Sequence, residues 1–198
     1  MARAVHVVLA AHPANPSCFR QHVDVSVRQA DDGGLVLTYG IHGPNLGLNV
    51  PTRHAPAPAD ALWRTTCCEL FVATAGAPAY REFNFSPSGQ WAACDFSQYR
   101  QRSAAAMVLP PPAIDCQRTD DHLRLVVTLP RSALPAGGEP VLALAVILQT
   151  QDGHSGYWAL AHPPGRPDFH HPAGFVLHSG QDGLRSMPAI IPPVAGLQ

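Results

Sequence analysis

The chain has 198 residues, of which 46% are hydrophobic and 14% charged, and its formal net charge is −1. This length and composition predict an ordered globular protein that folds as one domain. A charge so close to zero creates no field that would attract nucleic acid or an anionic membrane surface, so neither partner is expected. All 13 basic residues are arginines, which excludes catalysis by a lysine amine.

The 21 prolines and 16 glycines are spread between short apolar runs. Both residues interrupt helices and favour turns, so the sequence predicts many short strands and an all-β protein. No apolar run reaches the roughly 18 residues of a membrane helix, and residues 1–11 predict a strand, not a signal peptide. The five cysteines are odd in number and lack Cys-x-x-Cys spacing, so we expect reduced thiols in a soluble, cytoplasmic protein.

Period-two alternation marks the first half-buried strands. Val23, Val25 and Val27 alternate with polar residues up to the turn at residues 31–34, and the alternation resumes over residues 35–41 and again over residues 123–129. Residues 141–148 form a continuous apolar run, which predicts a central strand covered on both faces. Ala143 and Ala145 in that run leave room on one face, where a ligand or a loop could approach.

The segment from Tyr80 to Trp91 predicts a β-hairpin with one polar face. Alternation places Arg81, Phe83 and Phe85 on one side of the first strand, and Tyr80, Glu82 and Asn84 on the other. The two phenylalanines should enter the core. The Ser-Pro-Ser-Gly sequence at residues 86–89 supplies the turn, and Trp91 begins the returning strand.

Further strands are predicted at residues 66–74, 90–96, 156–161 and 173–179, which brings the total to about ten. Single helical turns are expected at residues 97–100 and at residues 132–134, the second with Ser132 as its cap. Residues 43–61 form a proline-rich crossing. We predict one antiparallel two-sheet β-sandwich of the jelly-roll type over residues 1–183, followed by a proline-rich tail over residues 184–198.

A cluster of histidines near the end of the predicted domain offers metal-ligand chemistry. His162, Asp168, His170 and His171 lie within ten residues of one another and carry suitable nitrogen and oxygen atoms. Their spacing matches no established metal motif. Because the chain has 11 histidines and loop histidines usually bond locally, the favoured interpretation is local hydrogen bonding.

Aromatic side chains next to polar segments suggest a saccharide site. Trp63, Trp91 and Trp158 have such positions, and sugar rings stack on aromatic planes while their hydroxyls bond to carboxylate, amide and guanidinium groups. An equally good interpretation makes each tryptophan a core anchor. Glu69 and Glu82 could form the acid and base of a glycoside hydrolase, although ion pairs to Arg64 or Arg81 are the favoured interpretation.

Three segments carry a resemblance to a known family. Residues 62–71, residues 80–91 and residues 157–163 with 167–170 resemble DOMON-like domain proteins, which are related to family 9 carbohydrate-binding modules. The resemblance extends from about Leu35 to Leu177, and its most specific part is Glu-Phe-Asn-Phe-Ser-Pro-Ser-Gly-x-Trp. It implies a β-sandwich that binds a ligand, because the wider superfamily includes sugar-binding modules and haem-binding domains.

In the sugar-binding relatives, two tryptophans enclose a terminal sugar, and the resemblance assigns this role to Trp63 and Trp158. In the haem-binding relatives a methionine pairs with histidine or lysine, but this chain has no lysine, and Met107 lies in a weakly matching region. A haem- or metal-binding redox domain is therefore the first alternative, and a hydrolase the second. No cofactor, calcium ion or other metal is predicted.

These observations together predict a non-catalytic domain that binds a small saccharide or the end of a glycan. The candidate ligand-binding residues come from the hairpin, the tryptophans and the histidine-containing segment. They are Trp63, Arg81, Glu82, Asn84, Trp91, Tyr157, Trp158, Asp168 and His170.

Overall fold

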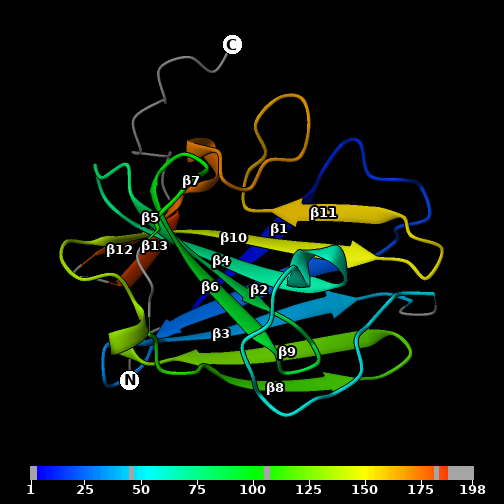
Figure 1. The fold of residues 1–198 in the computed structure, drawn as a ribbon. Helices are drawn as coiled ribbons and strands as arrows, with labels where there is room; N and C mark the ends of the chain where they lie inside the picture. The colour runs from blue at the N-terminus through cyan, green and yellow to red at the C-terminus, as the bar shows by residue number, and fades with distance from the viewer. Residues whose placement is uncertain (1–3, 45–46, 105–107, 181–182, 187–198) are drawn as a thin grey trace.

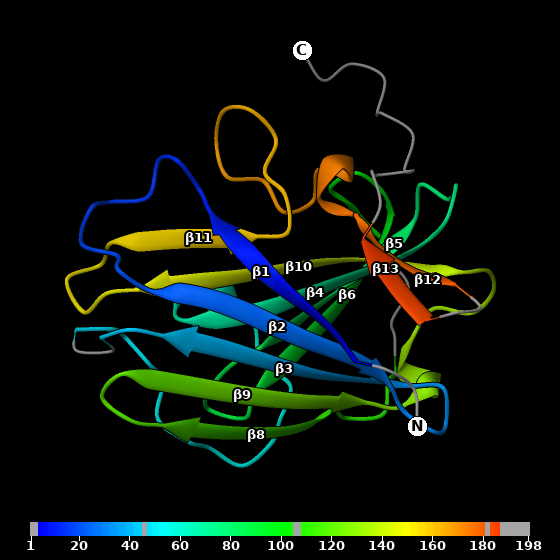
Figure 2. The same cartoon turned by 180° about the vertical axis from the view of Figure 1, so that it is seen from behind.

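The computed structural model describes residues 4–44, 47–104, 108–180 and 183–186 and consists almost entirely of antiparallel strands in two sheets packed face to face (Figure 1). The back sheet has the strand order β1 (Val5–Ala11), β2 (His22–Gln29), β3 (Leu35–His42), β9 (His122–Leu129) and β8 (Ala113–Arg118). Figure 2 shows these strands side by side from behind. The predicted all-β antiparallel sandwich is confirmed.

The second sheet carries the candidate site, and we call it the site sheet. Its order is β7 (Gln101–Arg102), β6 (Trp91–Gln98), β5 (Tyr80–Phe85), β4 (Cys67–Thr74), β10 (Pro140–Gln149) and β11 (Ser155–Ala159). Strand β12 (Leu177–Gly180) pairs with β10, and β13 (Gly183–Ser186) pairs with β12. Strand β1 belongs to both sheets, because Val5–Leu9 pairs with β2 while Ala10 and Ala11 pair with β11.

The core lies between the two sheets and is built by the predicted alternation. Val23, Val25 and Val27 of β2 point inward from the back sheet, and Phe83 and Phe85 of β5 meet them from the site sheet, all fully buried. Each such side chain contributes about 1.5–3 kcal/mol through removal of apolar surface from water. The inward phenylalanines leave the intervening residues of β5 on the outer face.

Strand β10 is buried on both faces, as its continuous apolar sequence predicts. One face joins the core, and near Ala143 the other is covered by the loop that leads to β12. A methyl group built on Gly174 of this loop would lie 3.7 Å from the Ala143 Cβ, and Phe175 packs in the same cluster as Phe71 and Ala143. At Ala143 the predicted open space is therefore filled by a loop.

The short helical elements differ from the prediction. Residues 97–100 form the end of β6 and a turn, while the turn near Ser132 is a 3₁₀-helix, η2 (Arg131–Ala133), that begins after Pro130 without a side-chain cap. Two further 3₁₀-helices, η1 (Leu62–Arg64) and η3 (Pro172–Gly174), were not predicted, because three residues are too few to show a periodic pattern. No helix in the described part of the chain is long and apolar enough to span a membrane.

The prediction of about ten strands omitted the short or weakly patterned strands β7, β8 and β13. The predicted tail begins within β13, and residues 187–198 lie outside the described residues. The remaining hairpin prediction is confirmed: β5 and β6 are joined by a turn in which Gly89 has a φ of 93°, a conformation that glycine adopts without strain.

Candidate functional site

Three planar polar side chains lie together on the outer face of the site sheet. Glu82 and Asn84 project outward from β5, as alternation predicts, and Glu69 of β4 stands directly opposite Asn84 in the strand register. Glu69 and Asn84 are buried and Glu82 is half-buried. The arrangement makes a polar floor within an otherwise apolar part of the sheet.

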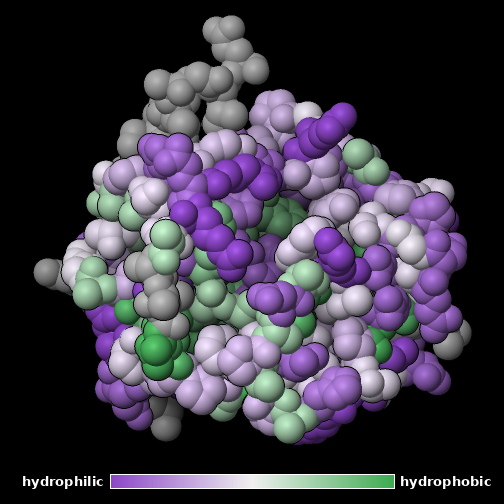
Figure 3. Space-filling model, in the orientation of Figure 1, coloured by the Kyte–Doolittle hydropathy of each residue, from purple (hydrophilic) through white to green (hydrophobic). Residues whose placement is uncertain are grey.

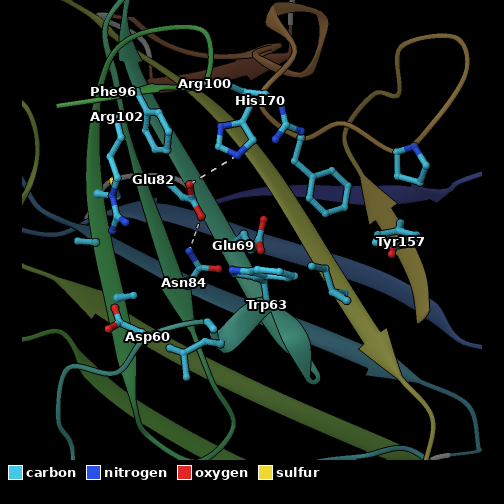
Figure 4. Close-up of a pocket in the computed structure, with 18 residues that line it drawn as sticks. Asp60, Trp63, Glu69, Glu82, Asn84, Phe96, Arg100, Arg102, Tyr157 and His170 are labelled. Atoms are coloured by element: carbon cyan, nitrogen blue, oxygen red, sulfur yellow. Dashed lines mark hydrogen bonds and ion pairs between the residues drawn. The ribbon is translucent and has the colours of Figure 1, made fainter. Parts of the chain in front are cut away.

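This floor is the base of a pocket of about 710 Å³. Strands β4, β5, β6, β10 and β11 contribute to its walls, together with η1 and the loop after β11 (Figure 4). Figure 3 shows the same face as a hollow bordered by hydrophilic residues. The lining residues are Asp60, Ala61, Leu62, Trp63, Glu69, Glu82, Asn84, Ala92, Ala93, Cys94, Phe96, Arg100, Arg102, Ile147, Tyr157, Pro167, Phe169 and His170.

Trp63 is the largest exposed aromatic side chain of the pocket. Helix η1 starts after Ala61, whose φ of 54° is left-handed and unfavourable for a residue with a Cβ, and the buried Leu62 anchors the turn. The next residue, Trp63, remains 52% exposed, and the Arg64 guanidinium lies 5.2 Å from its ring centroid. A large indole held at a pocket instead of in the core is available for contact with a ligand.

Further aromatic rings line other parts of the pocket. Tyr157 comes from β11 and Phe169 from the loop that follows, and their ring centroids are 6.0 Å apart. Phe96 of β6 is stacked on Tyr80 at a centroid distance of 4.8 Å. These side chains give the pocket apolar walls around the polar floor.

The two glutamates of the floor differ in their partners. Asn84 donates from Nδ2 to Oε1 of Glu82 at 2.5 Å, whereas the Glu69 carboxyl has no hydrogen bond or ion pair within the described part of the chain. Burial, and then the charge of Glu82, raises the pKa of Glu69 well above its ordinary value. Burial also raises the pKa of Glu82, although Asn84, Arg102 and Arg100 oppose this effect.

A chain of hydrogen bonds fixes His170 next to Glu82. The Arg100 backbone N–H donates to the Tyr80 hydroxyl at 3.0 Å, so this hydroxyl donates its own proton to Nδ1 of His170 at 2.8 Å. Neutral His170 then carries its proton on Nε2, which lies 3.7 Å from Oε2 of Glu82. Burial, followed by the charge of Arg100, lowers the pKa of His170 to about 4, which keeps the ring neutral at pH 7.

Asp168 holds the loop that carries His170. Its carboxylate accepts hydrogen bonds from the Tyr99 hydroxyl at 2.5 Å, from Arg100 Nη2 at 2.7 Å and from the His170 backbone N–H at 3.1 Å. These bonds, with Tyr99 and Arg100 as donors, lower the pKa of Asp168 despite its partial burial. Asp168 therefore supports the pocket without lining it.

Five of the predicted site residues line this one pocket: Trp63, Glu82, Asn84, Tyr157 and His170. The structure places the other four elsewhere, and Asp168 is one of them. Trp158 is only 2% exposed and packs in the core against Phe19, because its register opposite Val146 of β10 turns it inward. It is therefore not available as the second stacking residue that the resemblance implied.

Arg81 and Trp91 also lie away from the pocket. Arg81 points to the opposite face of β5, as alternation requires, and forms a bidentate pair with Asp95 at 2.6 and 2.8 Å. Trp91 is 7% exposed and belongs to the core, and it also lines a smaller adjacent pocket of about 260 Å³. Neither Arg64 nor Arg81 forms an ion pair with Glu69 or Glu82 among the described residues, so that expectation was wrong.

Sequence reasoning missed several pocket residues. Glu69 was considered only as half of an acid–base pair, and Phe96 could have been found by extending the alternation of β6 beyond Ala92 and Cys94. Arg100 lies within the segment 97–100 that was expected to form a helical turn, and Arg102 follows it in β7. No sequence signal places Asp60 or Phe169 in the pocket, because both lie in irregular segments.

The residues of the candidate metal cluster have other partners. His162 Nε2 bonds to the Ala10 carbonyl at 2.8 Å, Asp168 is engaged as described, and His171 Nδ1 accepts the Ala173 backbone N–H at 3.1 Å. Across the described ranges, no three histidine, cysteine, aspartate or glutamate side chains are grouped to hold a metal ion. Met107, the methionine considered for haem, lies outside the described residues.

The sequence matches no family model and no curated protein. Solved structures do match the fold. One is a Bacteroides uniformis protein to which carbohydrate binding is ascribed, with a TM-score of 0.59 and 17% identity over 94% of this chain and 86% of that one. Another is a family 9 carbohydrate-binding module from Caldicellulosiruptor kristjanssonii in complex with cellotriose, with a TM-score of 0.54 and 11% identity over 82% and 75% of the two chains.

The fold is similar to family 9 carbohydrate-binding modules. A glucose complex of such a module from the same organism matches with a TM-score of 0.50 and 11% identity over 79% of this chain and 76% of that one. At these identities the similarity concerns the fold. None of the three structures is described as a DOMON-like protein, so the resemblance to that family stays a prediction.

Proposed function

We propose that the pocket on the site sheet binds a small saccharide or the terminal residues of a glycan, without catalysis. The observation that carries this proposal is the combination of one exposed indole, Trp63, with three adjacent planar polar groups on a buried floor. A pocket of about 710 Å³ falls within the usual range for small-molecule sites, roughly 300–1,000 Å³.

Each part of the pocket suits one property of a sugar. The C–H face of a pyranose ring packs on an aromatic plane, for which Trp63 and Tyr157 are available. Sugar hydroxyls both donate and accept, and they are matched by carboxyl, amide and guanidinium groups such as Glu82, Asn84 and Arg102. Because Glu82 is already held by Asn84 and faces His170, ligand binding requires little ordering of this carboxyl.

The structural neighbours suggest the first ligands to test. Their complexes contain cellotriose and glucose, so glucose and its β-1,4-linked oligomers form the natural starting panel. Isothermal titration calorimetry with the full chain measures whether any of them binds. Failure of a broad panel of neutral, acidic and amino saccharides to bind would contradict the proposal.

Replacing Trp63 tests the pocket itself. Trp63→Ala should weaken binding by about tenfold or more, as expected for an aromatic anchor, whereas Trp63→Phe should retain part of the affinity. Val8→Ala is a suitable control, because Val8 is an exposed apolar residue that does not line the pocket. Equal affinity of the wild type and Trp63→Ala would show that the saccharide binds elsewhere.

A hydrolase is the second candidate, because Glu69 and Glu82 do share one pocket and both have raised pKa values. Glycoside hydrolysis uses two such carboxyl groups, one as an acid and one as a base or nucleophile. Prolonged incubation with the oligosaccharides that bind, followed by product analysis, separates the two functions. Products from the wild type that disappear in both Glu69→Gln and Glu82→Gln would favour the hydrolase over simple binding.

A further inference from the structure

Glu69 is a buried acid whose carboxyl has no partner within the part of the chain that the structure describes. The residue is 3% exposed, and its side chain lines the floor of the pocket between β5 and β10 (Figure 4). Its backbone lies in the ladders with β5 and β10, and its carbonyl also accepts from the Tyr39 hydroxyl at 2.9 Å, but its carboxyl has no hydrogen bond or ion pair among the described residues. A buried carboxyl in this state is destabilising unless a donor or a cation reaches it.

The groups around Glu69 do not supply that cation. Glu82 and Asn84 face it from β5, Ala145 and Ile147 from β10, and Trp63 from η1. His170, in the loop above, is turned toward Glu82 and is neutral at pH 7. The nearest charged neighbour is therefore another acid.

The two arginines of the pocket act on the other glutamate. Arg100 and Arg102 both oppose the rise in the pKa of Glu82, and neither affects Glu69. Arg100 is also paired with Asp168 at 2.7 Å, and Arg102 Nε lies 2.6 Å from the Cys94 Sγ. The pocket thus has an arginine side at β7 and an acidic, uncompensated side at Glu69.

We propose that the ligand carries a protonated amino group that binds at Glu69, which makes an amino sugar the preferred saccharide. This inference rests on the proposed saccharide-binding function. An ammonium group brings three donors and a positive charge, so it satisfies the Glu69 carboxyl and reduces its repulsion with Glu82 at the same time. A neutral hydroxyl can donate a hydrogen bond to Glu69, but it does not reduce the charge repulsion between Glu69 and Glu82.

The position of Trp63 is consistent with a cationic ligand. Its indole lies beside the Glu69 carboxyl in the pocket, and the face of an indole attracts cations. One cation, the Arg64 guanidinium, already lies 5.2 Å from this ring. An acid next to an aromatic face is a combination that selects ammonium over hydroxyl groups.

Three β-1,4-linked disaccharides that differ at carbon 2 test the inference by calorimetry at pH 6. Cellobiose has a hydroxyl there, the glucosamine dimer has an ammonium group, and the N-acetylglucosamine dimer has a neutral amide. The glucosamine dimer should bind at least about tenfold more tightly than either neutral disaccharide. Equal or weaker binding of the glucosamine dimer relative to cellobiose would overturn the inference and leave saccharide binding intact.

Glu69→Gln assigns the preference to this residue. The variant keeps the size of the side chain and removes its charge, so the ratio of the cellobiose Kd to the glucosamine-dimer Kd should fall to about one. Glu139→Gln is the matched control, because Glu139 is exposed and outside the pocket, and it should keep the full preference. An unchanged preference in Glu69→Gln would overturn the assignment.

Proton release provides a readout independent of affinity. Burial raises the pKa of Glu69 in the free protein, and an arriving ammonium group should lower that pKa, so binding should release protons to the buffer. The measured heat of binding for the glucosamine dimer should therefore depend on the ionisation enthalpy of the buffer, and this dependence should be lost in Glu69→Gln. Equal proton exchange in both proteins would contradict the inference, and binding of no saccharide at all would overturn it together with the proposed function.

Discussion

At the scale of single residues, Glu69 should make the free protein less stable as the pH rises. Its pKa is higher in the folded chain than in the unfolded one, where it is about 4.3. The stability linked to this group is fully present below the unfolded pKa and is lost as the pH rises through the folded pKa. A tenfold difference in proton affinity corresponds to about 1.4 kcal/mol.

Glu69→Gln removes this loss, so it should raise the melting temperature at pH 8 by roughly 2–4 °C or more, and by less at pH 5. Thermal unfolding followed by circular dichroism at both pH values measures the difference. Glu139→Gln, on the exposed surface, should leave both melting temperatures unchanged. If the melting temperatures of the wild type and of Glu69→Gln change with pH in parallel, the Glu69 carboxyl is not both buried and unpaired.

The Tyr80 hydroxyl joins two parts of the pocket, because it accepts from the Arg100 backbone and donates to His170. Tyr80→Phe leaves both partners unsatisfied and should lower the free energy of unfolding by about 1–3 kcal/mol. Urea unfolding measures this value. Tyr157→Phe is the control, because the Tyr157 hydroxyl has no hydrogen bond among the described residues and its loss should change stability little. Equal losses of stability in Tyr80→Phe and Tyr157→Phe would contradict the assigned hydrogen bonds.

At the scale of strands and loops, alternation predicted which side of β5 each residue faces. This succeeded for Phe83, Phe85, Glu82 and Asn84 because alternation is a local property of an extended chain. It could not choose between the adjacent residues Tyr157 and Trp158, since that choice depends on the register of β11 against β10. The pocket residues on η1 and on the loop after β11 could not be predicted either, because irregular segments have no repeating pattern of side-chain direction.

The loop over β10 gives a prediction at this scale. Ala143 is covered by the segment around Gly174 and Phe175, so Ala143→Leu should overpack the cluster and lower the free energy of unfolding by about 1–3 kcal/mol. Ala113→Leu, on an exposed position of β8, is the control. If urea unfolding shows no loss for Ala143→Leu, the loop does not pack on this face.

At the scale of the whole molecule, the sandwich separates the core from the candidate site. The inner faces of both sheets are apolar, and the outer face of the site sheet carries the acids of the pocket floor together with the aromatic rings of its walls. Composition and alternation were sufficient to predict this two-sheet architecture. Tyr80 and His170 are 90 positions apart in the sequence. Their hydrogen bond depends on the path of the loops, which the sequence pattern does not predict.

The central claim is that a saccharide binds in the pocket at Trp63. The three tryptophans offer a direct test, because Trp63 is exposed at the pocket while Trp91 and Trp158 are buried in the core. Nuclear magnetic resonance of the ¹⁵N-labelled full chain resolves one indole N–H signal for each, assigned with single Trp→Phe variants. Titration with the tightest-binding disaccharide should shift the Trp63 signal most strongly; saturation of binding with the Trp63 signal unmoved would contradict the account.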